Sequence, residues 1–241
     1  MVPARRYDAC VPEMIDDPDA DATMLRDELK SIRTINRFFG GYPALRRGVM
    51  KLLAGTESKT IRVLDLGTGS ADLPVYLVHL FRRLHRSIDI TAVDNHLRVV
   101  EVAKERTRQY NEISIETANL LNLNYAPGAF DIVICSLTLH HFSHEDAVKI
   151  LRSMHTLSRV GILLIDLDRS WVAAWTTKIY THLTTRNPMT RTDSYLSVLR
   201  GFTPGELKDM ALTSGLRDVE IYRRPFFRLL LIGTCQSKTA R

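Results

Sequence analysis

One short segment constrains the fold of this chain more than any other. Residues 61–66 form an apolar run that contains Asp65. Two glycines, Gly67 and Gly69, follow at alternate positions, and a helical pattern begins at residues 73–74. Proline is tolerated in a first helical turn because its missing N–H would be unpaired there. The segment therefore predicts a strand, a tight glycine turn and a helix N-terminus. In that geometry backbone N–H groups approach a nucleotide-like ligand, and a side chain in place of glycine would block the approach.

The acidic residues of this segment bear on the kind of ligand. A dinucleotide-binding turn has the spacing G-x-G-x-x-G, and its third glycine would fall at Asp72. A carboxylate at the helix N-terminus repels a pyrophosphate but suits a positively charged zwitterion, whose ammonium group Asp65 is placed to meet. A glycine turn that binds no cofactor is the alternative.

Strand and helix patterns alternate along most of the chain. Apolar runs of strand length predict strands over residues 61–66, 88–93, 113–117, 130–136, 161–167, 219–223 and 228–234. Helical spacing, with capping boxes at Ser143 and Thr203, predicts helices over residues 23–39, 43–53, 74–85, 97–110, 143–157 and 203–215. This alternation predicts an α/β fold with one doubly wound sheet and helices on both of its faces. Ligands in such sheets bind outside the carboxyl ends of the strands.

The glycine turn resembles the first motif of class I S-adenosylmethionine (SAM) methyltransferases, hydrophobic-hydrophobic-[Asp/Glu]-x-Gly-x-Gly-x-Gly. The last glycine is Ala71 here, and alanine is tolerated if its φ is negative. The resemblance covers about residues 60–235 and implies a seven-stranded Rossmann-like sheet in the order 3-2-1-4-5-7-6, with the last strand antiparallel. It implies SAM as the cofactor, and the binding residues of this turn would be Asp65, Gly67, Thr68 and Gly69.

Three later strand ends match the parts of this family that hold the rest of the cofactor. Asp94, followed by Asn95, can accept hydrogen bonds from both ribose hydroxyls; it can also cap the next helix, which is compatible with binding. Asn119 and Leu120 lie where family members bind adenine, and Asn119 retains an acceptor oxygen but lacks the usual charge. Ser136 matches the segment beneath the methionine part of the cofactor, where it is either a contact or a satisfied core hydroxyl.

Two adjacent histidines follow the strand over residues 130–136. His140 and His141 lie at the rim where the transferred methyl group would be, and we expect only one of them, preferably His141, to face the substrate. A neutral histidine can take a proton from a hydroxyl as the methyl group arrives. Asp166, at the end of the next strand, can orient the imidazole and balance its charge. The alternative is a structural turn in which histidine bonds the backbone.

The N-terminal segment precedes the minimal fold. We expect residues 1–55 to form an arm and lid helices, and residues 56–241 to form the methyltransferase domain. Residues 1–20 are rich in proline and aspartate, which predicts a mobile arm. The two helices that follow either cover the ligand site or pack on the edge of the sheet.

An insertion over residues 168–201 also exceeds the minimal fold and predicts a helical cap over the active-site face. Its apolar residues at helical spacing are Trp171, Trp175, Ile179 and Tyr180. A polar loop is expected over residues 186–195. Such a cap would select the substrate; the aromatic stripe either serves that purpose or packs internally.

Charge and cysteine content limit the partners. The net charge is +6, with an acidic N-terminal segment and a basic C-terminal third, but the basic residues are scattered, which favours a solvated surface over RNA binding. Attraction to an anionic membrane surface or an acidic carrier stays open. No apolar run approaches the roughly 20 residues of a membrane span, and the N-terminus does not resemble a secretory signal. The three cysteines lie far apart, which predicts a reducing, cytoplasmic location, no disulfide framework and no zinc site.

These observations lead to a predicted activity. Within the family, the chain looks most similar to bacterial enzymes that act on small molecules, the ubiquinone/menaquinone-type and O-methyltransferase branch. The acceptor would be a hydroxyl of a phenolic, quinone-like, polyketide or sugar compound, and the resemblance implies that no metal is needed. The alternatives are C-methylation of a quinone or polyketide ring, RNA methylation, and a binding module without catalysis.

Overall fold

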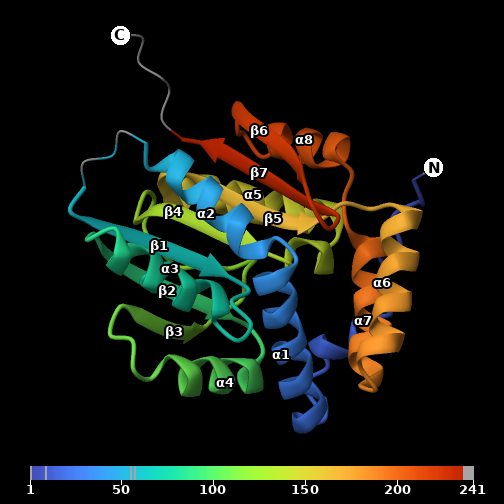
Figure 1. Cartoon of the computed structure of the whole chain (residues 1–241). Coiled ribbons are helices and arrows are strands. Elements are labelled where there is room, and N and C mark those ends of the chain that lie inside the picture. The colour runs from blue at the N-terminus through green and yellow to red at the C-terminus, as the bar shows by residue number, and fades with distance from the viewer. Residues whose placement is uncertain (1, 9, 55, 57, 236–241) are drawn as a thin grey trace.

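The computed structural model of the chain describes residues 2–8, 10–54, 56 and 58–235 and contains a single seven-stranded sheet among them (Figure 1). The strand order is β3-β2-β1-β4-β5-β7-β6, as predicted, and β7 runs antiparallel to both of its neighbours while β1–β5 are parallel. The strands are β1 (Thr60–Leu66), β2 (Ser87–Asp94), β3 (Ile113–Thr117), β4 (Phe130–Ser136), β5 (Ser158–Leu167), β6 (Asp218–Arg224) and β7 (Arg228–Thr234).

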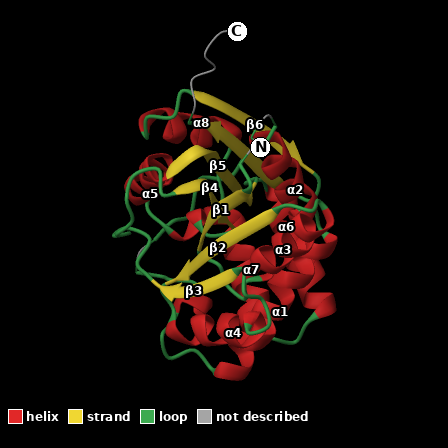
Figure 2. Cartoon of the chain, turned by 90° about the vertical axis from the view of Figure 1, so that its left-hand side faces the viewer, coloured by secondary structure: helices red, strands yellow, loops and turns green. Residues whose placement is uncertain are grey.

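Helices cover both faces of the sheet (Figure 2). On one face, α2 (Gly41–Leu52) and α3 (Asp72–Arg83) pack on the strands through one apolar cluster. On the other face, α5 (His144–Leu157) and α8 (Pro204–Thr213) pack through a second cluster. The helix α4 (Leu97–Thr107) contacts β3 and β2 at the edge of the sheet. The central strand β4 is buried along nearly its whole length, which explains its continuous apolar run. Burial on both faces confirms the doubly wound arrangement.

The register of the parallel strands brings the predicted site residues to one edge of the sheet. Leu66 of β1 lies opposite Val93 of β2 and Cys135 of β4. The residues that follow these positions, the glycine turn, Asp94 and Ser136, therefore meet where the three strands end. Asp166 lies one strand further, near the end of β5.

Three helices stand beyond this carboxyl edge: α1 (Ala22–Phe38) in the lower middle of Figure 1, and α6 (Trp171–Thr184) and α7 (Pro188–Arg200) on its right. The helices α6 and α7 pack on each other, and α1 contacts α7. Helices from distant parts of the sequence therefore enclose the same space. None of the helices in the described part of the chain is long and apolar enough to cross a membrane.

The predicted polar loop over residues 186–195 is wrong, because most of it belongs to α7. The side chain of Asn187 accepts a hydrogen bond from the backbone N–H of Met189 at 2.9 Å, and Pro188 occupies the first helical position. Asparagine as N-cap followed by proline is a helix start signal. The stripe on α6 also differs from simple packing, because Trp175 is 52% and Ile179 58% exposed.

Several residues of the predicted mobile arm make specific hydrogen bonds with α7, so the prediction is wrong for that part of the segment. The Asp193 carboxylate accepts hydrogen bonds from the backbone N–H groups of Met14 (3.0 Å) and Ile15 (2.9 Å). Arg6 donates its backbone N–H to the carbonyl of Leu199 at 3.0 Å. Glu13 is only 2% exposed. Polar composition predicted a solvated segment, whereas buried partners on α7 hold it in place.

Candidate active site

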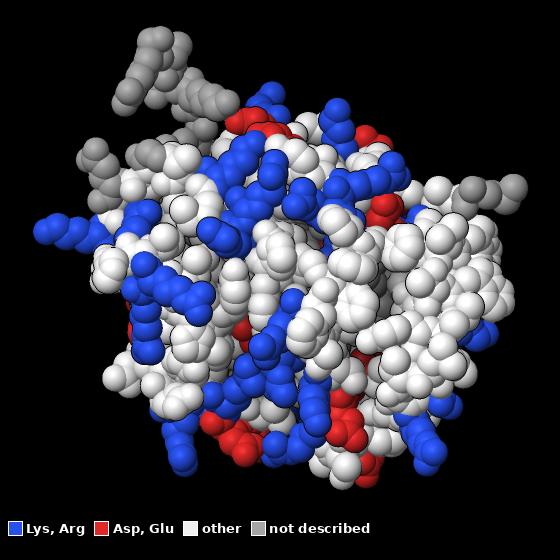
Figure 3. All heavy atoms as spheres, viewed as in Figure 1, with Lys and Arg blue, Asp and Glu red and all other residues white. Residues whose placement is uncertain are grey.

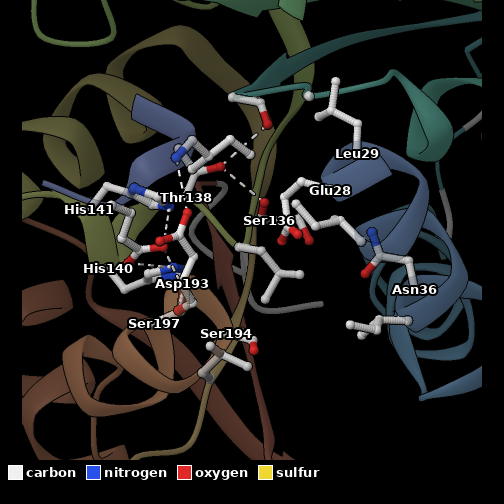
Figure 4. Close-up of a pocket in the computed structure, with 18 of the residues that line it drawn as sticks. Glu28, Leu29, Asn36, Ser136, Thr138, His140, His141, Asp193, Ser194 and Ser197 are labelled. Carbon is white, nitrogen blue, oxygen red and sulfur yellow. Dashed lines mark hydrogen bonds and ion pairs between the residues drawn. The ribbon is translucent and has the colours of Figure 1, made fainter. Parts of the chain in front are cut away.

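A cavity of about 330 Å³ lies at the carboxyl edge, between the strand ends and the helices α1, α6 and α7. In Figure 4 its wall carries Glu28, Leu29 and Asn36 of α1 on one side, and His140, His141 and residues of α7 on the other. Its described lining includes seven acidic residues, which are Glu13, Asp16, Glu28, Asp65, Asp72, Asp94 and Asp193. The cavity is therefore acidic although the whole chain is basic.

The glycine turn has the backbone geometry that its sequence predicts. Gly67 has φ +67°, and a Cβ at this position would lie 2.3 Å from the hydroxyl oxygen of Thr138. The backbone N–H groups of Gly67 and Thr68 both donate to the carbonyl of Val93 at 2.9 Å. Glycine is required at residue 67 for both reasons, its φ and the close approach of Thr138.

Ala71 departs from our expectation. Its φ is +55° and its ψ +34°, in the left-handed region, where the family motif has glycine. The condition under which alanine would be tolerated here, a negative φ, is therefore not met. A residue with a Cβ in this conformation costs about 1 kcal/mol or more relative to the right-handed form. The hydrogen bond from the Ala71 N–H to the carbonyl of Thr68 (2.9 Å) holds the turn in this shape.

Asp65 presents an unsatisfied charge to the cavity. It is 2% exposed, and its Oδ2 atom has no hydrogen-bond partner among the described residues. Burial raises the pKa of Asp65 to about 7, and the nearby carboxylates of Asp72 and Asp94 act in the same direction. A buried oxygen without a partner is costly unless a ligand satisfies it. The residue is thus suited to a cationic group.

Asp94 joins the glycine turn to the end of β2. Its Oδ2 accepts the backbone N–H of Gly69 at 3.0 Å, and its Oδ1 accepts the backbone N–H of His96 at 3.1 Å. Burial raises the pKa of Asp94. Asp94 and Asn95 both line the cavity. A carboxylate oxygen can accept more than one hydrogen bond, so Asp94 can bind a ligand hydroxyl while it holds the turn.

His140 and Asp166 form a buried pair. The Nδ1 atom of His140 lies 2.6 Å from Oδ1 of Asp166, and both side chains are at most 3% exposed. Burial alone would raise the pKa of Asp166, but the charge and hydrogen bond of His140 lower it. His140 lines the cavity, whereas Asp166 lies behind it, as a residue that orients the imidazole would.

His141 has a different environment. Its Nδ1 atom lies 2.8 Å from Oδ2 of Asp16, and Glu13 lies on its other side. Burial lowers the pKa of His141, but the carboxylates of Glu13 and Asp16 outweigh this effect and raise it to about 9. An imidazolium cannot accept a proton. The surroundings therefore favour His140 over His141 as a base.

Comparison with known proteins identifies the domain. Residues 63–161 match the family profile described as "Methyltransferase domain". This range contains the glycine turn, Asp94 and both histidines, within a sheet that has the predicted strand order. The chain carries a class I SAM-dependent methyltransferase domain. Its cofactor is SAM.

Relatives of this methyltransferase cover it to different extents. The demethylmenaquinone methyltransferase of Thermotoga maritima is 27% identical over 202 residues, which are 78% of this chain and 82% of that protein. An uncharacterised protein of Synechococcus is 33% identical over 88 residues, 35% of this chain and only 20% of its own length.

Solved structures share its fold. A SAM-dependent methyltransferase from Aquifex aeolicus matches with a TM-score of 0.60 at 13% identity, over 91% of this chain and 99% of that one. Human N-acetylserotonin methyltransferase matches with a TM-score of 0.62 at 16% identity, over 90% of this chain and 57% of that one.

The remaining predicted cofactor residues of the methyltransferase are placed unequally. Leu120 and Ser136 line the cavity. Asn119 is exposed, lies outside the lining, and its side-chain oxygen accepts the backbone N–H of Leu121 at 2.9 Å. Adenine recognition by Asn119 stays a prediction. A side chain already used in a local turn has one fewer acceptor site for a ligand.

Several cavity residues were not found from the sequence. Glu28 accepts a hydrogen bond from the Thr190 hydroxyl, and burial raises the pKa of Glu28 to about 7. Arg228 is 1% exposed and donates to the carbonyl of Phe39 (2.9 Å) and to the side chain of Asn36 (3.1 Å); burial lowers its pKa to about 10. Local patterns give no signal for these residues, because each acquires its role from a partner far away in the sequence.

Proposed function

We propose that this methyltransferase transfers the methyl group of SAM to a hydroxyl oxygen of a small-molecule acceptor. The observation that carries the proposal is the buried His140–Asp166 pair, with its 2.6 Å contact, at a wall of the cavity that also holds the glycine turn. The names of similar proteins agree with a small acceptor: they include a demethylmenaquinone, a magnesium protoporphyrin IX and an N-acetylserotonin methyltransferase. A cavity of about 330 Å³ has the size of a small-molecule site.

The residues of the chain would divide the work as follows. Asp65 would accept hydrogen bonds from the ammonium group of SAM, and Asp94 would accept them from the ribose hydroxyls. The glycine turn would let backbone N–H groups approach the cofactor closely. SAM, when bound, supplies an electrophilic methyl group on a sulfonium. His140 takes the proton of the acceptor hydroxyl at Nε2, and Asp166 stabilises the imidazolium that results. The helices α1, α6 and α7 position the acceptor and exclude water.

A matched pair of variants tests the base. His140→Gln removes the proton acceptor, and we expect kcat to fall by roughly 10²- to 10⁴-fold with little change in the Kd for SAM. Asp166→Asn leaves a hydrogen-bonding group of the same shape and should lower kcat less. The readouts are methyl transfer from labelled SAM to a panel of phenolic, quinone and sugar acceptors, and calorimetric titration of SAM. A His140→Gln protein with normal kcat would show that His140 has a structural role.

Other activities give different results in the same assays. C-methylation would use the same cofactor residues, and the mass and NMR spectrum of the product separate it from O-methylation. RNA methylation would require tight, salt-dependent RNA binding, whereas the acidic cavity lining repels phosphates. A protein that binds neither SAM nor its demethylated product would not be an enzyme of this class.

A further inference from the structure

We propose that Glu13, His140 and His141 form a binding site for a divalent transition-metal ion of the Zn²⁺ type, and that a bound ion blocks His140. Each residue offers one ligand atom, and these atoms all lie within 4.8 Å of one another. All three residues line the cavity, so an ion can reach them. No local pattern predicts this site, because Glu13 precedes the histidines by more than a hundred residues and no ligand-spacing motif is present.

The distances between the three groups suit an ion rather than direct hydrogen bonds. The Nε2 atom of His140 lies 3.9 Å from Oε1 of Glu13, and the Nε2 atom of His141 lies 3.8 Å from Oε2 of Glu13. Direct hydrogen bonds would measure about 2.7–3.2 Å. Two ligand atoms about 2.1 Å from a tetrahedral Zn²⁺ are roughly 3.4 Å apart, which small side-chain movements would reach from here.

Both histidines have the second partner that metal-binding histidines usually have. Nδ1 of His140 lies 2.6 Å from Asp166, and Nδ1 of His141 lies 2.8 Å from Asp16. A carboxylate at Nδ1 keeps a proton on that nitrogen and orients the ring, so that Nε2 is the atom that binds a metal, with release of any proton that Nε2 carries. In both residues the Nε2 atom is the one that faces Glu13.

The carboxylate of Glu13 is also held in place. The hydroxyl of Ser197 donates to Oε2 at 2.6 Å, and a guanidinium nitrogen of Arg200 lies 3.5 Å from Oε1. Hydrogen bonds of this kind orient ligating carboxylates in metal sites. Two imidazoles and one carboxylate favour Zn²⁺, Co²⁺ or Ni²⁺ over Mg²⁺ and Ca²⁺, which prefer oxygen ligands alone.

The effect of the ion on catalysis rests on the proposed function, whereas its binding does not. A metal on Nε2 of His140 takes the lone pair that would accept the hydroxyl proton. The metal and the base function of His140 therefore exclude each other. We expect Zn²⁺ to inhibit methyl transfer and a chelator to restore it, while Mg²⁺ has no effect. SAM binding should change little, because Asp65 and Asp94 are not among the three ligands.

The experiment titrates the chelator-treated full chain with Zn²⁺ by calorimetry and with Co²⁺ by visible absorption. We expect one ion per chain and a Co²⁺ spectrum typical of nitrogen and oxygen ligation. Glu13→Gln and His141→Ala should weaken binding by roughly 100-fold or more. His144→Ala is the matched control, because His144 is exposed and close in sequence, and it should bind like the unmodified chain.

The outcomes separate the two proposals. Two results would refute the metal site. The first is that the unmodified chain binds no stoichiometric Zn²⁺ or Co²⁺, which requires no variant. The second is that Glu13→Gln and His141→Ala bind the ion as tightly as His144→Ala does. Stoichiometric binding without inhibition of methyl transfer refutes the block of His140. Stoichiometric binding in a protein that methylates no acceptor supports the site and counts against the proposed function.

Discussion

The charge of Asp65 offers a quantitative test of how the cavity is built. Burial raises the pKa of this residue from 3.8 to about 7 in the folded protein. An acid whose pKa is higher in the folded than in the unfolded state stabilises the fold least when it is ionised, so its contribution falls as the pH rises from about 4 through 7. With 1.36 kcal/mol per pKa unit, the full penalty is roughly 4 kcal/mol, of which roughly 2–3 kcal/mol develops between pH 5 and pH 8.

The substitution Asp65→Asn removes this titration while it keeps the shape of the side chain. Without SAM, we expect the free energy of unfolding of the variant to exceed that of the unmodified chain by an amount that grows by roughly 2–3 kcal/mol from pH 5 to pH 8. Urea unfolding of both proteins at each pH measures the difference, in which the other titrating groups cancel. A constant difference across this range would refute the assigned burial penalty.

Cofactor binding should show the opposite trend. Because only the ionised carboxylate attracts the ammonium group of SAM, the affinity of the unmodified chain should fall roughly tenfold between pH 7.5 and pH 6. Asp65→Asn should bind SAM weakly at every pH in this range. Calorimetric titration gives both values, and equal affinity of the two proteins at pH 7.5 would show that Asp65 does not meet the cofactor.

Three further substitutions test the backbone. Gly67→Ala places a Cβ 2.3 Å from a side-chain oxygen, so it should lower the free energy of unfolding by roughly 2–4 kcal/mol and abolish SAM binding. The control Gly128→Ala has a similar φ of +66° and nothing within 4 Å of the added Cβ, so urea unfolding should show a loss of only about 1 kcal/mol. Ala71→Gly should raise the free energy of unfolding by up to about 1 kcal/mol, because glycine adopts this φ without strain. The control Ala103→Gly lies within a helix and should lower it by about 1 kcal/mol. A loss at both positions would contradict the strain at residue 71. Thr203→Ala removes the capping box, so it should lower the free energy of unfolding by about 1 kcal/mol and the melting temperature with it. Thr203→Ser keeps the hydroxyl and should change neither.

The elements of the sheet were predictable because their signals are local. β3 and β4 begin and end at the predicted residues, and β5 begins three residues earlier than expected. Alternating strands and helices permit few topologies, which is why the family resemblance implied the correct strand order. The turn after β1 was also predictable, since closely spaced glycines indicate a backbone conformation that other residues adopt only at a cost.

The wall opposite the glycine turn was not predictable for a physical reason. Asp16 and His141 are 125 positions apart, and Glu13 and Arg200 are 187 apart, so no local pattern relates them. Acidic residues near the N-terminus have the composition of a solvated arm, and only the partners on α7 and beside His140 show that Glu13 is buried. The start of α7 is a different case, because its signal is local: Asn187 and Pro188 form a cap and first helical position. The polar composition of residues 186–195 favoured a loop in spite of this signal.

The acidic cavity inside a basic chain shows why net charge is a poor guide to the ligand of this protein. The charge of +6 comes from Lys and Arg side chains, many of which lie on the outer surface in the face that Figure 3 shows, where water and salt screen them. The carboxylates of the cavity lie in surroundings of low dielectric constant, where each charge acts more strongly on its neighbours. Burial accordingly raises the pKa of Asp65 and of Glu28 to about 7. A cationic ligand relieves this accumulation of negative charge and a phosphate adds to it, so the local balance favours a sulfonium cofactor or a metal ion and opposes nucleic acid.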